Sequence, residues 1–228
     1  MLIEISYVLG KSIPKWPTNP TETPDINQSF EKGDPCNATS IYHHMHNGTH
    51  VDAPKHFSKN GRSITEIPIE DFYYARPLVL KMKKNQGQLI TQADLLPFEK
   101  EIEEADILCV YTGYADTRDK NPQAYVDNFP AFSPDAAYYL RTNFLKLKAV
   151  AIDVVSVESS VDGPKNGFPV HRTFLDKLEG DNPRTLLLYE DVDLKKLVSI
   201  NQPIHAIYAF PIRWEGAEAA PVNMVAMC

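Results

Sequence analysis

Short apolar runs separated by polar segments dominate the chain after Pro77. Five of these runs are rich in branched and aromatic residues and have the length of buried strands. They cover residues 78–82, 106–112, 149–155, 185–190 and 205–212. An earlier run of the same character covers residues 3–9. The pattern predicts a strand in each of these segments.

One segment between the runs has the spacing of a helix. Ser133 and Pro134 suit the N-cap and the first helical position, and apolar residues recur every three or four positions from Ala137 to Leu147. We therefore predict a helix over residues 133–147. Strands that alternate with helical segments are typical of α/β proteins, so we expect one compact domain over residues 1–228, with a mixed sheet flanked by helices.

The first third of the chain, up to about Pro68, is rich in proline, asparagine, threonine and histidine. After the run at residues 3–9 it has no further strand pattern, and we expect an irregular region that depends on the rest of the domain. Within it, the polar and proline-containing residues 19–35 are a candidate lid or subunit contact.

Composition and charge narrow the class of partner. Thirty acidic and 23 basic residues give a net charge of −7, and lysine and arginine form no cluster, which argues against nucleic acid or an anionic membrane as partner. No apolar run reaches the roughly 20 residues of a membrane span, and the start MLIEISYVLGK does not resemble a signal peptide. Three scattered cysteines fit neither a disulfide framework nor a cysteine zinc site. We expect a cytoplasmic protein with a small-molecule ligand.

Histidines are concentrated in one short stretch. Five of the seven lie between His43 and His56, where a 14-residue window would hold about 0.4 by chance. Asp52 lies among them, and imidazole with carboxylate is a ligand set for Zn²⁺, Mn²⁺ or Fe²⁺. A set of solvated or structural histidines is the alternative, but the clustering favours a metal site.

The spacing within this stretch requires a bend. His46 and His50 are four residues apart, and the Gly, Thr, Val and Pro residues around them disfavour a helix. In a straight strand they would lie about 13 Å apart, at the limit for sharing an ion. Gly48 is the residue that permits a bend, after which His50, Asp52 and His56 share one face of an extended segment.

Further ligands are expected from downstream, because a catalytic metal commonly uses ligands from more than one segment. His171 follows Pro169 at an apparent helix start, and Glu190 ends an otherwise apolar strand. Glu190 could equally be a capping or solvated acid in the run EDVD. Asp153 could support a metal-bound histidine or cap a neighbouring turn.

The pattern H-x-G-T-H-x-D-x-P-x-H-F at residues 46–57 resembles the signature of the cyclase family of metal-dependent hydrolases, whose best-known members are bacterial kynurenine formamidases and isatin hydrolase. Further segments are similar to motifs of that family: 16–17, 133–140, 149–159, 171–175, 188–194 and 210–226. Two features depart from the family pattern. EGDNPR, residues 179–184, is an apparent insertion, and EAAPVN at 218–223 replaces the usual G-S-P-x-R.

The resemblance implies an α/β fold of the swivelling β/β/α type, assembled as a dimer or tetramer, with one or two divalent ions, zinc or manganese. The metal ligands that it implies are His46, His50 and Asp52, with His171 and Glu190 completing a second site. His56 would be the catalytic acid/base, and Trp16 would line the substrate pocket.

These parts predict a metal-dependent hydrolase of a small amide, either N-formyl or cyclic, on an aromatic or acidic scaffold. The ion would activate water and His56 would move its proton to the leaving nitrogen. A metal-dependent lyase or cyclising dehydratase needs the same metal and base and remains the alternative. A non-catalytic metal-binding protein is a third hypothesis.

Overall fold

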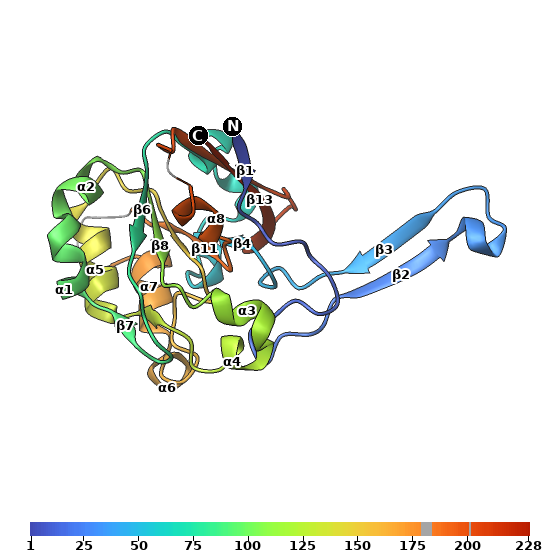
Figure 1. Ribbon diagram of the computed structural model, residues 1–228, viewed down its shortest axis with the longest axis horizontal. Helices are drawn as coiled ribbons and strands as arrows, with labels where there is room; N and C mark the ends of the chain where they lie inside the picture. The colour runs from blue at the N-terminus through green and yellow to red at the C-terminus, as the bar shows by residue number, and fades with distance from the viewer. Residues whose placement is uncertain (179–183, 201) are drawn as a thin grey trace.

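A mixed β-sheet runs through the centre of the molecule (Figure 1). In the computed structural model, which describes residues 1–178, 184–200 and 202–228, its strands lie in the order β5, β12, β13, β4, β11, β10, β8 and β6, and β1 pairs with β13 beside this row. Their bounds are β1 Leu2–Glu4, β4 His50–Asp52, β5 Tyr73–Tyr74, β6 Pro77–Lys81, β8 Ile107–Tyr111, β10 Ala149–Ile152, β11 Leu187–Glu190, β12 Ala206–Pro211 and β13 Ala219–Met227.

Strand β4 lies where the parallel half of the sheet meets the antiparallel half. β6, β8, β10 and β11 pair in parallel, whereas β4 is antiparallel to both β11 and β13. Across the β4–β11 pair, Glu190 faces His50 and Leu188 faces Asp52. The carboxyl end of β11 is therefore next to the histidine-rich segment, at a change of strand direction where α/β sheets commonly bind ligands.

Helices cover the sheet and close two apolar cores. α5 and α7 contribute to one core with β8, β10 and β11, while the other core lies between β4, β12, β13 and the turns around residues 64–72. The helices are α1 Gln92–Leu95, α2 Glu99–Glu104, α3 Asp116–Lys120, α4 Pro122–Val126, α5 Pro134–Asn143, α6 Gly163–Asn166, α7 Pro169–Leu175 and α8 Lys195–Val198. Short 3₁₀ turns cover Phe30–Lys32, Pro54–His56, Ile64–Glu66, Ile69–Phe72 and Leu96–Phe98. No helix among the described residues is long and apolar enough to cross a membrane.

The predicted α/β fold, a mixed sheet flanked by helices, is confirmed. The predicted helix is present as α5, and the Ser133 hydroxyl accepts a hydrogen bond from the backbone of Ala136 as expected of an N-cap. Its predicted end at residue 147 is wrong, because the backbone leaves the helical region at Phe144 (φ −110°, ψ 87°). All three cysteines are free.

The strand predictions hold for the later runs and fail near the N-terminus. Each of the five runs after Pro77 contains a strand, namely β6, β8, β10, β11 or β12. The predicted strand at residues 3–9 is too long, since β1 ends at Glu4 and Ser6 forms only an isolated bridge with Val192. The apparent insertion at 179–184 lies, except for Arg184, outside the described residues.

The polar N-terminal region is not irregular throughout. β2 (Thr23–Gln28) and β3 (Ala38–Tyr42) form an antiparallel hairpin that projects from the body of the molecule (Figure 1). A second small sheet, β7 (Leu89–Ile90) with β9 (Ala131–Phe132), lies beside α5. The hairpin includes most of the residues for which the sequence indicates a lid or a subunit contact.

Candidate metal centre and active site

A bend at Gly48 brings the first two histidines of the cluster together. Gly48 has a positive φ of 68°, and the ring centroids of His46 and His50 are 5.2 Å apart. Thr49 fixes the bend, because its hydroxyl donates to the carbonyl of Asp191 (2.6 Å) and accepts from the amide of Tyr7 (2.9 Å). The predicted bend is confirmed, and it places both imidazoles near one point.

Three carboxylate and imidazole groups converge at the β4–β11 pair. His50 Nε2 lies 3.4 Å from Asp52 Oδ1 and 3.5 Å from Glu190 Oε2. The other oxygen of Glu190 accepts hydrogen bonds from the Ser156 hydroxyl (2.9 Å) and the Val157 amide (2.7 Å). Glu190 is thus held by one oxygen and its other oxygen faces His50. It is buried, so the alternative of a solvated acid is wrong, while its bond from the Val157 amide fits the alternative of a capping acid.

His171 reaches the same cluster from α7. Its Nε2 lies 3.6 Å from Asp52 Oδ2 and 3.4 Å from Glu190 Oε1. Its Nδ1 lies 3.4 Å from Glu158 Oε2, which also accepts from the backbone amides of Val170 (2.9 Å) and His171 (3.1 Å). Glu158 therefore orients the imidazole, as a carboxylate behind a metal-binding histidine commonly does.

Asp52 is the common member of two groups whose ligand atoms lie within 4.8 Å of one another. One group is His46, Asp52 and His56, and the other is His50, Asp52 and Glu190. Both oxygens of Asp52 and Nε2 of His50 are buried without a hydrogen-bond partner, although Asp52 Oδ1 is 2.9 Å from His46 Nδ1. Buried polar atoms without partners are costly, and a divalent cation would satisfy all of them. The donor set of imidazoles and carboxylates therefore fits a divalent metal ion.

His56 lies close to both His46 and His171. It ends the 3₁₀ turn that begins at Pro54, and its ring centroid is 4.0 Å from that of His46 and 5.7 Å from that of His171. Burial, helped by the neighbouring imidazoles, lowers the pKa of His56 to about 3 against the pull of Asp52. The imidazole is consequently neutral at pH 7.

The environment of His46 raises the pKa of its imidazole, whereas that of His56 lowers it. Burial lowers the pKa of its imidazole, but the Asp52 carboxylate more than offsets that effect and raises the pKa to about 10. On its other side, His46 Nε2 lies 3.3 Å from Glu218 Oε1, and this contact is the main cause that lowers the pKa of Glu218 to about 2.

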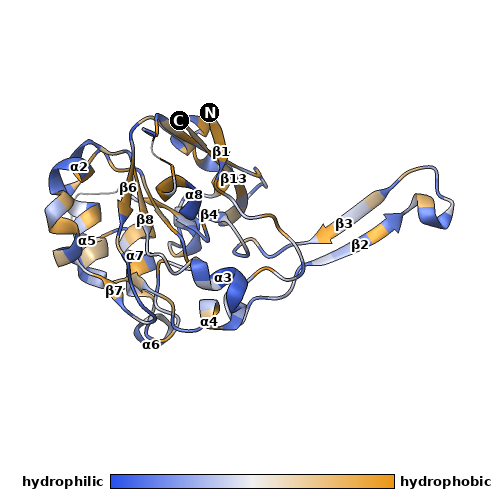
Figure 2. Cartoon of the chain, in the orientation of Figure 1, coloured by the Kyte–Doolittle hydropathy of each residue, from blue (hydrophilic) through white to orange (hydrophobic). Residues whose placement is uncertain are grey.

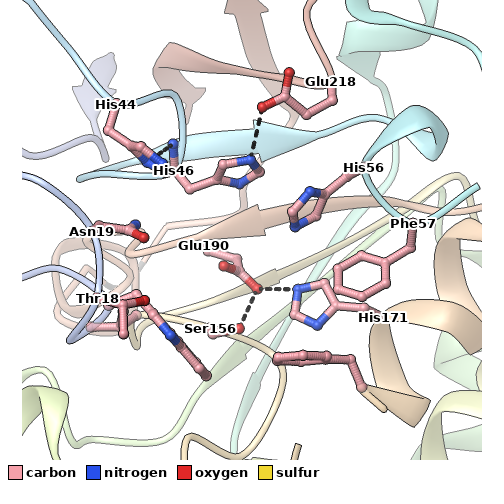
Figure 3. Close-up of a pocket in the computed structure, with 13 residues that line it drawn as sticks. Thr18, Asn19, His44, His46, His56, Phe57, Ser156, His171, Glu190 and Glu218 are labelled. Carbon is pink, nitrogen blue, oxygen red and sulfur yellow. Dashed lines mark hydrogen bonds and ion pairs between the residues drawn. The ribbon is translucent and has the colours of Figure 1, made fainter. Parts of the chain in front are cut away.

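A pocket of about 370 Å³ opens over the cluster (Figure 3). Its walls combine aromatic rings with polar and ionisable groups, and its lining residues are Trp16, Thr18, Asn19, His44, His46, His56, Phe57, Val155, Ser156, Phe168, His171, Glu190 and Glu218. Trp16 packs edge-on against Phe129 at 6.2 Å, and Phe57 stacks on His171 at 4.7 Å. Trp16, predicted to line the substrate pocket, is in the wall of this one.

All of the predicted site residues lie at this pocket or directly beneath it, while several participants were not predicted. Glu158, Glu218 and Ser156 contact predicted residues, and His44 lines the pocket. Ser156 and Glu158 had one sequence signal, their position after a predicted strand, where site residues often lie. His44 belongs to the histidine cluster of the sequence, although no role was predicted for it. Asp153 caps the turn after β8 by accepting from Thr112 and Gly113, so its second interpretation is correct.

Most of the chain is similar in sequence to known proteins. Residues 3–159 match the sequence model of the Cyclase family, described as "Putative cyclase". An uncharacterized protein of Haemophilus influenzae is 36% identical over 107 residues, which are 47% of this chain and 75% of that protein. The kynurenine formamidase of Bacillus mycoides is 25% identical over 223 residues, covering 98% of this chain and 95% of that one.

The fold is shared with solved structures. An isatin hydrolase bound to the product analogue thioisatinate superposes with a TM-score of 0.82 at 18% identity, covering all of this chain and 92% of that one.

Proposed function

The chain belongs to the cyclase family, and from this membership and the geometry of the pocket we propose that it is a metal-dependent hydrolase of small amides. One observation carries the proposal. The unpartnered atoms of Asp52 and His50 lie among imidazoles and carboxylates beneath an aromatic pocket. The names of the related proteins, kynurenine formamidase and isatin hydrolase, support cleavage of a carbon–nitrogen bond outside peptides.

The residues that would hold zinc or manganese are His46, His50, Asp52, His171 and Glu190. Two groups that share Asp52 support a site for one or two ions. A bound divalent ion polarises a carbonyl oxygen and lowers the pKa of a water molecule toward neutrality. Ser156 and Glu158 keep Glu190 and His171 in place by the hydrogen bonds described above.

His56 is the proton carrier in this proposal. Its neutral imidazole takes a proton from the attacking water and returns it to the nitrogen that leaves as the carbon–nitrogen bond breaks. Trp16, Phe57 and Phe168 form an apolar wall that would bind the aryl part of the substrate and exclude bulk water.

The assembly and compartment are part of the same proposal. The substrate is a small molecule, the protein is a homo-oligomer, and the three free cysteines fit a reducing compartment such as the cytoplasm. Neither a nucleic acid nor a membrane is a partner, in line with the net charge of −7 and the absence of a basic cluster.

Product analysis tests the reaction. Protein loaded with zinc or manganese is incubated with N-formylaniline and with isatin, and formate and ring-opened product are measured against protein stripped of metal. Hydrolysis predicts formate or isatinate only with the loaded protein. Loss of water from a hydroxylated substrate, with no hydrolysis of either amide, would instead establish the lyase or cyclase alternative.

A further inference from the structure

The pocket over the cluster contains a carboxylate that the proposed set of metal ligands does not use. Glu218 lies directly before β13 and lines the pocket, and its Oε1 is 3.3 Å from His46 Nε2. Its backbone carbonyl accepts from the amide of Ala53 at 2.9 Å, which fixes the residue beside the end of β4. The side chain is nevertheless 42% exposed, so the carboxylate faces the open pocket as well as His46 (Figure 3).

No lysine or arginine balances this carboxylate. Neither residue type is present among the described residues that line the pocket. Three basic residues adjoin lining residues in the sequence, namely Lys15, Lys55 and Arg172, and each donates a hydrogen bond to a backbone carbonyl. An anionic group of a substrate would therefore find no lysine or arginine partner in the described walls of the pocket.

The charges of the cluster compensate one another when an ion is bound. Imidazoles that bind a metal ion are neutral. The carboxylates of Asp52 and Glu190, which belong to one of the two candidate ligand groups, balance the charge of one divalent ion. Among the described lining residues, Glu218 is then the carboxylate that no cation balances.

Another wall of the pocket is aromatic and apolar. The ring centroid of Phe168 lies 6.4 Å from that of Trp16 and 5.5 Å from that of Phe57. Trp16 and Phe57 pack against the apolar core to which β8 contributes, and β8 is largely hydrophobic in Figure 2. This wall suits an aryl ring, as small-molecule pockets commonly combine apolar walls with a few placed polar groups.

Glu218 and the aromatic wall lie on either side of two histidines. The centroid of the His56 ring is 4.0 Å from that of His46 and 4.5 Å from that of Phe57, and His46 contacts Glu218. Figure 3 shows the rings of His46 and His56 between Glu218 and Phe57. An aryl ring on the wall, with its amide at the cluster, can therefore direct a substituent next to the amide across the histidines toward Glu218.

We propose that Glu218 selects the substrate, and that the substrate is an aryl amide with a cationic group, and no carboxylate, next to the amide. The inference rests on the proposed amide hydrolase and names its substrate class. A cation beside Glu218 gains a charge-assisted contact, whereas an anion there meets a like charge in a partly dehydrated pocket. A substituent that carries both charges gains from one and loses from the other.

Selection of the substrate can be separated from positioning of His46. A residue that only positions His46 changes the affinity for the ion and the turnover of all amides by the same factor. A selecting carboxylate changes the rate of one substrate relative to another. Glu218→Gln distinguishes the two roles, because the amide oxygen can still accept a hydrogen bond from His46 Nε2 while the negative charge is removed.

Three N-formylanilines of similar shape test the effect of charge. Their ortho groups are trimethylammoniomethyl, neopentyl and sulfonatomethyl, which are positive, neutral and negative. In the metal-loaded wild type, kcat/KM for formate release should be at least about tenfold higher for the cation than for the anion. Glu218→Gln should lower this ratio at least about tenfold, mainly through KM. Glu215→Gln, at an exposed acid of the preceding turn, is the matched control and should leave the ratio unchanged.

Salt provides a test that needs no variant. Raising the ionic strength from about 0.01 M to about 1 M shortens the Debye length from about 30 Å to about 3 Å. Because Glu218 is partly exposed, the ratio of cation to anion in the wild type should fall as salt is added. A ratio that does not depend on salt would contradict selection by charge.

Binding decides the inference separately from the reaction. In calorimetry with metal-loaded protein, benzyltrimethylammonium should bind at least about tenfold more tightly to the wild type than to Glu218→Gln. If none of the formanilides is hydrolysed, the proposed amide hydrolase is wrong and this binding comparison still tests Glu218. Equal affinities in the two proteins, an unchanged ratio in Glu218→Gln, or a wild-type preference for the sulfonate would overturn the proposal. Metal analysis and circular dichroism establish that both variants are loaded and folded.

Discussion

Asp52 is the residue on which the site depends most. It is fully buried and lies within 3.6 Å of nitrogens from His46, His50 and His171, which come from two parts of the chain, the segment around Gly48 and α7. A carboxylate in this position is tolerable only with positive charge around it, from protonated imidazoles or from cations. Neither of its oxygens has a hydrogen-bond partner, which favours cations.

The role of His56 can be separated from that of its neighbours by substitution. His56→Ala should leave the metal content unchanged and reduce turnover by at least about 100-fold, because general acid–base catalysis contributes roughly 10²–10⁴-fold. Metal content is measured by mass spectrometry and turnover by formate release. Loss of a bound ion in the variant would make His56 a ligand, as its grouping with His46 and Asp52 permits, and full activity would exclude either role.

A buried ion pair fixes the backbone next to Glu190. Arg118 donates two hydrogen bonds to Asp191, at 2.9 and 2.8 Å, and lies 3.6 Å from the ring centroid of Tyr7. Asp191 has a positive φ of 50°, and its carbonyl accepts from Thr49. The pair therefore holds together the two segments that carry His50 and Glu190.

Arg118→Met tests this pair. It leaves Asp191 buried without its partner, and we expect a loss of about 3–5 kcal/mol in the free energy of unfolding of the metal-free protein. Urea unfolding gives the value. Lys195→Met, which removes an exposed pair with Asp116, is the control and should leave the free energy of unfolding nearly unchanged. Equal losses in the two variants would show that Arg118 has no special role.

Among single residues, the sequence predicted the cluster of histidines with Asp52 and missed the side chains that contact this cluster. His46, His50, Asp52 and His56 could be grouped because they are close in sequence. Glu158 and Glu218 could not, because their roles depend on where α7 begins and where the chain enters β13. Such contacts are set by tertiary packing and leave no local pattern.

Among the elements, the turn that carries His56 leaves no room for a side chain at Gly61. Gly61 lies against the backbone of this turn, and a Cβ there would be 2.4 Å from the carbonyl carbon of Pro54 and 2.6 Å from the amide nitrogen of Lys55. The Lys55 amide also donates to the Arg62 carbonyl at 3.1 Å. Close approach of two backbone segments requires glycine.

Gly61→Ala should therefore displace the turn, with a loss of about 1–3 kcal/mol in stability and a fall in turnover. Thermal unfolding and formate release are the measurements. Gly10→Ala, where a Cβ would meet nothing within 4 Å, is the matched control and should leave stability and turnover nearly unchanged. An unchanged turnover in Gly61→Ala would mean that the position of His56 is not set by this contact.

The sequence predicted best those strands in which every residue is buried. β8 and β10 are buried on both faces and appear as apolar runs in the sequence. β4 is three residues long and contains two proposed ligands, β13 contains Pro221, and the β2–β3 hairpin is mostly polar, so none of them has a strand pattern. These strands exist because they pair with neighbours distant in sequence.

The whole molecule should depend on its metal for stability. An ion that binds only the folded state stabilises it by about 4 kcal/mol when its concentration is 1,000 times the dissociation constant. Stripping the protein with a chelator should lower the melting temperature by several degrees, and added zinc or manganese should restore it. Asp52→Asn should melt at the same temperature with and without the ion; a wild type insensitive to chelation would contradict the fit of the cluster to a cation.

The central claim is that the cluster around Asp52 holds the ion on which amide hydrolysis depends. The most direct measurement titrates metal-stripped protein with zinc or manganese and follows, in the same samples, bound ions per chain and the rate of formate release from an N-formyl anilide. We predict no release without metal and a rate that rises with the ions bound and levels off at one or two per chain. Release from fully stripped protein, or none from fully loaded protein, would contradict the account.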